Sequence, residues 1–253
     1  MNARRAQASR REAPPKRGTL FVCGLGIDRP NDTTLGTVGT LKNCAVAFYM
    51  HGDGKLLEPF LKTFCPDVRL FGGGEFDALP DEKRIEIVAA AVCAELSRGK
   101  DVAYVTYGHP TLFSDGFNVL QACRANGYAG RVLTAPSAVD SILSAALDLV
   151  DALSGGFLVC KADRVLERKN FLKTDFPAIL LCLDQVVAGG KYGVFCDRLE
   201  AAYPRGHRVF GVKCGDNHGE AVRLSGRVDQ LRRWEGKIVH MMSLVLPASR
   251  GRP

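Results

Sequence analysis

The sequence predicts an α/β protein of two domains: an N-terminal, doubly wound and mainly parallel sheet, then a smaller mixed α/β domain. Two observations predict this. Short apolar runs alternate with longer helical patterns over the first 150 residues, as in a parallel sheet with crossover helices. The rhythm changes around "DALSGG" (151–156), where a second set of apolar runs begins. The predicted divisions are a disordered basic tail (1–18), two domains (19–150 and 155–247) and a frayed end (248–253).

Five apolar runs in the first half predict strands, at 19–26, 45–50, 67–72, 101–108 and 131–135. Helical patterns fill the intervals, at 32–44, 54–64, 80–100, 115–126 and 137–149. The first should open with Asp32 or Thr33 as its N-cap. The third is the clearest, because Pro80 and acidic residues lead it and "RGK" (98–100) ends it. The second contains Pro59 and is still predicted to be helical.

The second domain is predicted from four further apolar runs, at 156–162, 178–187, 208–215 and 238–247. Two short helical patterns lie among them, at 191–203 and 226–234. This succession indicates a more mixed sheet than the first, because the helical patterns no longer separate every pair of runs.

The positive charge of the chain is concentrated at its start. The net charge is +7, and residues 1–18 hold six Lys or Arg against one acid, which leaves +2 for the rest. Such a tail could contact nucleic acid or simply be solvated, and we expect neither nucleic-acid binding nor a membrane partner for the folded body. No apolar run is long enough to span a bilayer and no signal-peptide pattern appears, which favours a cytoplasmic protein.

Nine cysteines and five histidines offer candidate metal ligands, but their spacing does not support a site. The cysteines are odd in number, form no C-x-x-C pair and lie mostly in apolar segments, so they are predicted to be buried, reduced thiols. The histidines are scattered without ligand spacing, so no metal is predicted.

Three strand-end loops contain small or turn-forming residues: "GLG" (24–26), "YGHP" (107–110) and "APSA" (135–138). Loops at the carboxyl ends of parallel strands are the usual ligand sites of such sheets. The first is no dinucleotide fingerprint, because Arg29 stands where the third glycine should be and no acidic residue ends the second strand. It can be a plain tight turn or a place where the backbone approaches a ligand.

The loop "YGHPTLFS" (107–114) suits a ligand held by main-chain groups. Gly108 permits unusual dihedral angles, and Pro110 forces His109 toward extended geometry. His109 has no orienting partner visible in the sequence, so it is a better candidate for holding the turn than for a general base. Tyr107 is the better candidate for chemistry.

Taken together, these motifs resemble the S-adenosylmethionine-dependent tetrapyrrole methylase superfamily, and within it the borosin-type peptide α-N-methyltransferases. The resemblance covers roughly residues 19–247 and rests on the order of its markers. These are "VCGLGID", "RGKDVAYVTYGHPTLF", "RVLTAPSAVDSIL", "KADRVLERKNF", "AILLCLDQVV", "GGKYGVFCDRLEAAYP" and "MMSLVLP".

The resemblance implies two α/β domains with the cofactor, S-adenosylmethionine, in a cleft between them, S-adenosylhomocysteine as product, and a homodimer. It implies that the cofactor is bound by three groups of residues: Gly24 and Gly26; Tyr107, Gly108, His109, Pro110, Leu112 and Phe113; Ser137, Ala138, Ala162, Leu183 and Gln185. For several of them a purely structural role stays open, with Leu112, Phe113 and Leu183 as core and Ser137 as a helix N-cap.

The chain departs from the borosin pattern in one respect. Borosin enzymes resemble one another in a Tyr/Arg/Tyr group before the "YGHP" strand, whereas "LFGGGEFDALPDEKRIEIVAAAV" (70–92) contains no tyrosine. Arg84 is the candidate for the arginine and Tyr107 for the remaining hydroxyl. Three functions stay open: a methyltransferase for a separate, unfused peptide, possibly on backbone nitrogen; a methyltransferase for a small molecule or tetrapyrrole; and a non-catalytic, partner-binding member.

Overall fold

The computed structural model describes residues 17–50, 54–145, 153, 155–168, 171–216 and 219–249. The predicted basic tail therefore lies almost wholly outside the described residues. Contacts divide the chain into two units, and each is described by itself. The first comprises Met1–Val22, Gly39–Tyr104 and Gly116–Val132; the second comprises Cys23–Val38, Val105–Asp115 and Leu133–Pro253.

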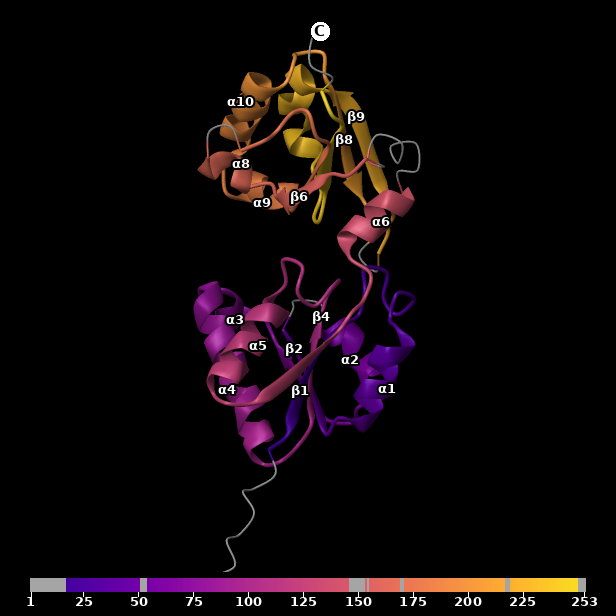
Figure 1. The fold of residues 1–253 in the computed structure, drawn as a ribbon, viewed down its shortest axis with the longest axis vertical. Helices are drawn as coiled ribbons and strands as arrows, with labels where there is room; N and C mark the ends of the chain where they lie inside the picture. Colours follow the sequence, from indigo (N-terminus) through magenta and orange to yellow (C-terminus); the bar gives the residue numbers. More distant parts are fainter. Residues whose placement is uncertain are drawn as a thin grey trace, which may run out of the picture. The chain divides into compact units, whose positions relative to one another are not determined.

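The first sheet is parallel and has five strands in the order β3-β2-β4-β1-β5 (Figure 1). Helices cover both of its faces, with α1 and α2 on one and α4 and α5 on the other, which confirms the doubly wound prediction. The elements are β1 (Thr19–Gly24), α1 (Leu35–Asn43), β2 (Val46–Met50), α2 (Gly54–Lys62), β3 (Val68–Phe71), α3 (Gly74–Asp77), α4 (Asp81–Ser97), β4 (Val102–Thr106), α5 (Asp115–Ala125) and β5 (Ala129–Leu133).

The second sheet is mixed, in the order β6-β7-β10-β8-β9. β6 and β7 run parallel, whereas β10 is antiparallel to β7 and β8, and β9 is antiparallel to β8. Its elements are α6 (Ala138–Ala145), β6 (Leu158–Lys161), α8 (Arg164–Glu167), β7 (Ala178–Leu181), α9 (Leu183–Ala188), α10 (Tyr192–Ala202), β8 (Arg208–Lys213), β9 (Val222–Arg227), η2 (Val228–Lys237) and β10 (Ser243–Leu246).

Among the described residues, the core includes three apolar clusters. One lies in the first unit, where Phe48 and Tyr104 pack with Val88 and Leu96 of α4. The other two lie on opposite faces of the second sheet, one centred on Phe195 and Trp234 and the other on Ile142 and Phe210. The strands β2, β4 and β7 are buried along their whole length, so they read as continuous apolar runs.

Several sequence predictions need correction at the level of single elements. The run 178–187 is only half a strand, because Cys182 adopts a left-handed conformation (φ 60°) and α9 begins directly after it. The run 238–247 forms a strand only from Ser243. The sequence analysis does not predict β9. This edge strand alternates between partly buried and exposed residues and therefore contains no apolar run.

The predicted caps are also partly wrong. The hydroxyl of Thr34, and not Asp32 or Thr33, caps α1 by accepting the N–H of Thr37 at 3.2 Å. Asp32 instead accepts the N–H groups of Ile27 and Asp28, both at 2.9 Å, and thereby closes the loop after β1. The helix containing Pro59 forms as predicted.

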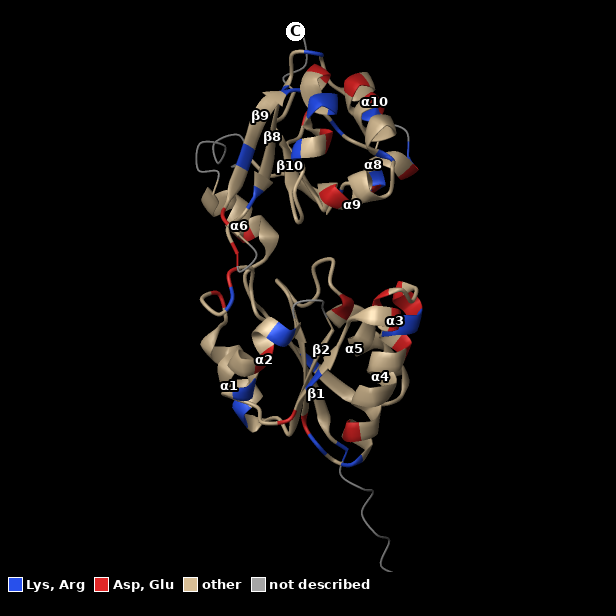
Figure 2. Cartoon of the chain, turned by 180° about the vertical axis from the view of Figure 1, so that it is seen from behind, with Lys and Arg blue, Asp and Glu red and all other residues tan. Residues whose placement is uncertain are grey.

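Charged groups are distributed unevenly. Acidic residues gather around α3 and the first turn of α4, whereas β8 and β9 carry basic ones (Figure 2). No helix among the described residues combines the length and apolar character needed to cross a membrane. All nine cysteines are free thiols, as predicted, and six of them are buried.

Candidate functional site

The three predicted strand-end loops meet at Gly24. A side chain there would lie 2.4 Å from the carbonyl oxygen of Gly108, 2.7 Å from Cβ of Ala135 and 2.8 Å from Cδ of Pro110. These distances are too short for any non-bonded carbon, so only glycine permits the three loops to pack together. The prediction that small residues mark this junction therefore has a direct steric cause.

Backbone hydrogen bonds extend this junction beyond the strands. Leu25 donates its N–H to Thr106 at 3.0 Å, and Gly108 donates to the carbonyl of Gly26 at 2.9 Å. Gly26 and Gly108 both have positive φ (79° and 65°), a conformation that costs a residue with a Cβ atom about 1–2 kcal/mol. The loops after β1 and β4 are thus held in a fixed, glycine-dependent geometry.

A pocket of about 90 Å³ opens beside this junction, wholly within the second unit. Its lining combines one glycine and several apolar residues with two serines, a tyrosine, a histidine and a cysteine. The lining residues are Ile27, Tyr107, Gly108, His109, Leu112, Phe113, Ser137, Ala138, Leu181, Cys182, Met241 and Ser243.

Backbone strain is concentrated at this pocket. The non-glycine residues with positive φ among those described are Phe113 (52°), Cys182 (60°) and Met241 (63°), and all three line it. Left-handed conformations of bulky residues persist only where surrounding structure enforces them, and they cluster at ligand sites. Two larger hollows of the second unit, about 490 and 390 Å³, contain none of these residues. We therefore place the candidate site at the smaller pocket, because the strained residues and the strand-end loops meet there and not at the larger hollows.

A buried polar cluster lies behind Tyr107. The Tyr107 hydroxyl donates to Oδ2 of Asp216 at 3.2 Å, and Nζ of Lys213 lies 3.0 Å from Oδ1 of the same carboxylate. The guanidinium of Arg29, a residue only 1% exposed, lies 4.5 Å from the Tyr107 ring centroid. Burial, and then the charge of Asp216, raises the pKa of the Tyr107 phenol well above its ordinary value, while Arg29 partly opposes this.

His109 and Ser137 both hold turns. Nδ1 of His109 lies 3.3 Å from the N–H of Thr111, so the imidazole closes the turn that it belongs to. Ser137 caps α6: its hydroxyl accepts the N–H of Val139 and donates to the carboxylate of Asp140 at 2.6 Å. Burial opposes the ionisation of Asp140, but hydrogen bonds from Ser137 outweigh it and lower the pKa of the carboxyl. Both residues also line the pocket, so the two roles coincide.

Not every predicted site residue reaches the pocket. Ala162 and Leu183 are fully buried in the core of the second sheet, and Gln185 is exposed. Leu181 and Cys182, immediately before the predicted Leu183, line the pocket instead. Arg84 lies on α4 in the first unit, where it pairs with Asp81 one turn earlier.

Sequence reasoning missed Arg29, Lys213, Asp216, Cys182 and Met241. A usable signal existed only for Lys213, a lysine at the end of the apolar strand "RVFGVK" that must find a partner once buried. The left-handed Cys182 and Met241 carry no such signal, because nothing in a cysteine or methionine predicts positive φ.

Comparison with known proteins identifies the relatives of this chain. Residues 19–213 match the family described as Tetrapyrrole (Corrin/Porphyrin) Methylases. Among curated proteins, the chain is 29% identical over 87% of its length to the methyltransferase and cyclic peptide precursor of omphalotin A from Omphalotus olearius. It is 30% identical over 77% of its length to a type I borosin precursor with a methyltransferase from Serendipita vermifera subsp. bescii. The chain spans about half the length of these relatives (55% and 49%).

Solved structures give the same fold. Uroporphyrin-III-C-methyltransferase from Thermus thermophilus aligns with a TM-score of 0.65 and 19% identity, covering 92% of this chain and 93% of that one. A diphthine synthase aligns with a TM-score of 0.62 and 15% identity, over 91% and 90% of the two chains. At these identities the alignments establish the fold.

Proposed function

Because the chain belongs to the tetrapyrrole methylase family, we propose that it is an S-adenosylmethionine-dependent methyltransferase that acts on a separate peptide. The observation that carries the proposal is the pocket beside the Gly24 junction, which is lined by Tyr107 and by the three residues with left-handed backbone conformations. The names of the curated relatives, which combine a methyltransferase with a ribosomally synthesised cyclic peptide precursor, support the peptide acceptor.

The pocket residues fit the cofactor chemically. A nucleoside attached to an amino acid needs main-chain hydrogen bonds, apolar contact and a few hydroxyls, which the glycine loops, Leu112, Met241 and Ser243 offer. Bound S-adenosylmethionine supplies an already activated methyl group. The protein must then orient the acceptor in line with that methyl and exclude water.

The acceptor demands more than alignment. An amide nitrogen is a poor nucleophile, so it needs a nearby group that accepts its proton. Tyr107 is the candidate on the pocket wall, since it lines the pocket and its hydroxyl bonds to Asp216. Arg84 is the weaker candidate, because its guanidinium already pairs with Asp81.

A small-molecule or tetrapyrrole acceptor is the alternative. It is favoured by the absence of tyrosine from residues 70–92 and by the likeness to a uroporphyrin-III methyltransferase. A non-catalytic, partner-binding role, with or without cofactor, is the third candidate, and a failure to bind cofactor would leave it as the only one of the three.

Incubation with S-adenosylmethionine carrying a trideuterated methyl group tests the proposal. The acceptor probes are a synthetic apolar peptide and uroporphyrinogen III, each analysed by mass spectrometry. We expect the peptide to gain a trideuteromethyl group that fragmentation locates on a backbone nitrogen. Labelling of the porphyrinogen alone would favour the alternative, and no cofactor binding by calorimetry at millimolar concentration would leave only the non-catalytic role.

The variant Gly108→Val tests where the cofactor binds. Valine at φ 65° strains the loop, and the new Cβ would lie 3.3 Å from Cδ1 of Ile27. We expect cofactor affinity to fall about tenfold, the equivalent of roughly 1.4 kcal/mol. Wild-type affinity in this variant would contradict the placement of the cofactor against this loop.

The same proposal includes a cytoplasmic homodimer. Nine free thiols are typical of a reducing compartment, and the family resemblance favours the dimer. Light scattering coupled to size exclusion tests the dimer directly, and a monomer at assay concentration would contradict it.

A further inference from the structure

Two hollows of the second unit adjoin each other, because Phe171 lines both of them. The larger, of about 490 Å³, is also lined by a buried residue of α8, two arginines and a threonine: Val165, Arg168, Arg198 and Thr174. The smaller, of about 390 Å³, is also lined by two further phenylalanines and a lysine: Phe157, Phe176 and Lys173. These residues define what we call the docking tract.

The docking tract is separate from the candidate cofactor pocket. Phe157 and Phe176 lie just before β6 and β7 begin. Leu181 and Cys182, which line the candidate pocket, lie where β7 ends. Since β6 and β7 run parallel, the two sites lie at opposite ends of the same strands, and no described residue lines both.

The cations of the docking tract lack a counter-ion among the described residues. The side chains of Arg168, Lys173 and Arg198 form no ion pair or hydrogen bond within that part of the chain. Arg198 is half-buried on α10, whereas Arg168 and Lys173 are exposed. Asp175, the acid that follows Lys173 most closely, is exposed too and pairs with none of them. The tract therefore carries positive charge that the described fold does not neutralise.

The neighbouring acids are bonded to other arginines. At α8, Glu167 pairs with Arg164, and on α10 both acids pair with one arginine of η2, in the ion pairs Asp197–Arg232 and Glu200–Arg232. A guanidinium bonded in this way has part of its N–H fork occupied. The arginines of the docking tract keep theirs for a carboxylate that a ligand brings.

The phenylalanines make up the apolar half of the tract. Phe176 is 51% exposed, and Phe157 and Phe171 are half-buried. Phe171 also packs against the core cluster that contains Phe195 and Trp234, which fixes its position. Rings that are partly exposed around one hollow are typical of a binding surface, because contact with an apolar side chain removes them from water.

We propose that the docking tract binds an acidic segment of the peptide substrate, one that carries glutamate or aspartate beside phenylalanine or leucine. The inference rests on the proposed function, because that function requires a separate peptide. The carboxylates pair with Arg168 and Arg198, and the apolar side chain enters the hollow between the phenylalanines. A linear chain suits a tract in which two hollows of different chemistry follow each other. β7 is four residues long, so a peptide segment of similar length, at roughly 3.3 Å per residue, covers the same distance along the sheet.

Binding is measured without any methyl transfer. The probe is a fluorescein-labelled hexapeptide, Glu-Phe-Leu-Glu-Phe-Glu, titrated with the protein and followed by fluorescence anisotropy. We expect saturable binding that weakens as the salt concentration rises. The same peptide with lysine in place of each glutamate should not bind, and equal binding of the two peptides would overturn the inference.

The arginines are tested one at a time. Arg168→Gln and Arg198→Gln should each weaken probe binding about tenfold, the scale of one hydrogen bond to a charged group. Neither arginine forms an ion pair among the described residues, so both variants should keep the wild-type melting temperature. The matched control, Arg164→Gln, replaces an arginine of α8 that pairs with Glu167 and lies outside the tract, and it should bind like wild type. Wild-type affinity in the double variant Arg168→Gln/Arg198→Gln would overturn the inference.

Phe176→Ala tests the apolar half. Because the ring is 51% exposed, its removal should spare the fold and weaken probe binding about fivefold. The matched control is Val194→Ala, which shortens a side chain of α10 that is 54% exposed and lies outside the tract. Equal affinity in Phe176→Ala and wild type would overturn the assignment of the apolar side chain to this hollow.

Two results would assign the docking tract to another occupant and overturn the proposal. If 3-phenylpropionate bound as tightly as the hexapeptide, the tract would be a site for a small aromatic acid. If light scattering showed a wild-type dimer that dissociates in Arg168→Gln/Arg198→Gln, a second copy of the chain would cover the tract.

Turnover separates this inference from the proposed function. The acceptor is an apolar peptide, tested with and without the acidic hexapeptide appended. We expect the appended segment to lower KM about tenfold at unchanged kcat, and Arg168→Gln/Arg198→Gln to abolish the difference. Methylation with the same KM for both peptides would overturn the role of the docking tract and leave the methyltransferase intact. Probe binding by a protein that methylates no peptide would defeat the proposed function, while the tract would still stand as a site for acidic peptides.

Discussion

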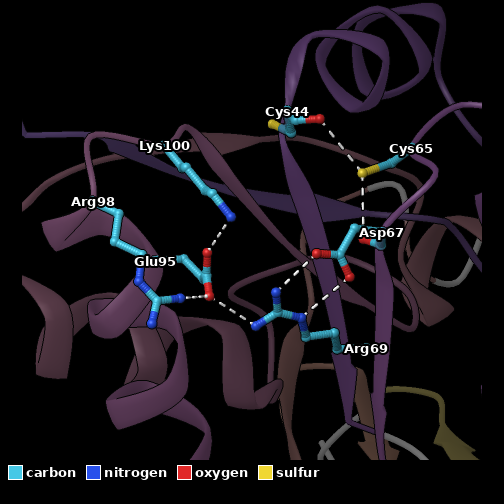
Figure 3. A network of polar contacts seen from close by, with 7 residues as sticks. All are labelled: Cys44, Cys65, Asp67, Arg69, Glu95, Arg98 and Lys100. Carbon is cyan, nitrogen blue, oxygen red and sulfur yellow. Dashed lines mark hydrogen bonds and ion pairs between the residues drawn. The ribbon is translucent and has the colours of Figure 1, made fainter.

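Among the described residues, both units have a buried carboxylate held by lysine or arginine, and the two carboxylates differ in what else they touch. In the first unit, Glu95 is 2% exposed and bonds to Arg69, Arg98 and Lys100, so cations surround it (Figure 3). In the second unit, Asp216 bonds to one lysine and to the hydroxyl of Tyr107, which lines a pocket.

The difference is between a network that lies within the first unit and a cluster that reaches the candidate pocket of the second. The Glu95 network is closed by further contacts within the first unit: Arg69 also pairs with Asp67, whose carbonyl lies 3.5 Å from Sγ of Cys65 (Figure 3). The bond between Arg69 and Glu95 joins β3 to α4, and the network therefore contributes stability. The Asp216 cluster instead includes Tyr107, a residue that lines the candidate pocket. Four predictions test that distinction, in order of decreasing effect.

Tyr107→Phe should separate chemistry from stability most strongly. The change removes the hydroxyl but keeps the ring beneath Arg29, so we expect methyl transfer to fall about 100-fold while cofactor affinity changes little. Turnover and calorimetry on the same preparation measure the two effects. An unchanged rate would remove Tyr107 from the chemistry.

Glu95→Gln should lower the stability of the protein without affecting cofactor binding. It leaves Arg69, Arg98 and Lys100 without their shared carboxylate, and we expect a loss of about 2 kcal/mol in the free energy of unfolding. Cofactor affinity should not change. Urea denaturation measures the stability. An unaltered midpoint would show that water solvates the three cations well enough without Glu95, and would contradict a stabilising role for the network.

The acid stability of the protein should depend on the same residue. Hydrogen bonding from Lys100, opposed by burial and reinforced by Arg69, lowers the pKa of Glu95 from 4.5 to about 2. Because the folded state holds the charged form more tightly, this stabilisation is complete above pH 4.5 and is lost as the pH falls toward 2.

Denaturation midpoints of wild type and Glu95→Gln, measured across that interval, should therefore converge. A constant difference down to pH 2 would contradict the assignment of the lowered pKa to Glu95.

Lys100→Met should have the smallest effect. Its side chain is 40% exposed, so the ion pair with Glu95 is screened by water, and two arginines still hold the carboxylate. We expect a loss of about 0.5–1 kcal/mol. Lys213→Met is the informative counterpart, because Lys213 is almost fully buried; a loss no larger than that of Lys100→Met would indicate that the Asp216 pair is weaker than its geometry implies.

Features that depend on local sequence could be predicted, whereas contacts between distant residues could not. The alternation of apolar runs and helices predicts the first sheet, and the glycines and prolines after β1, β4 and β5 predict the loops that meet at Gly24, because each is a local property of the chain. The contact between Tyr107 and Asp216 joins residues 109 positions apart, and no periodicity encodes such a pairing.

The second sheet is harder to predict from the sequence for a related reason. Its strands are short and mixed in direction, so one left-handed residue, Cys182, decides where β7 ends and α9 begins. The same conformation places Cys182 at the pocket, whereas the predicted Leu183 points into the core.

The left-handed residues also matter for protein engineering. Glycine adopts the backbone conformations of Phe113, Cys182 and Met241 without strain, so a search for heat-resistant variants would be drawn to these positions. Each such gain would remove a side chain from the wall of the candidate site. A variant library selected for thermal tolerance alone should therefore accumulate substitutions that widen the pocket, and selection for cofactor binding would have to accompany it.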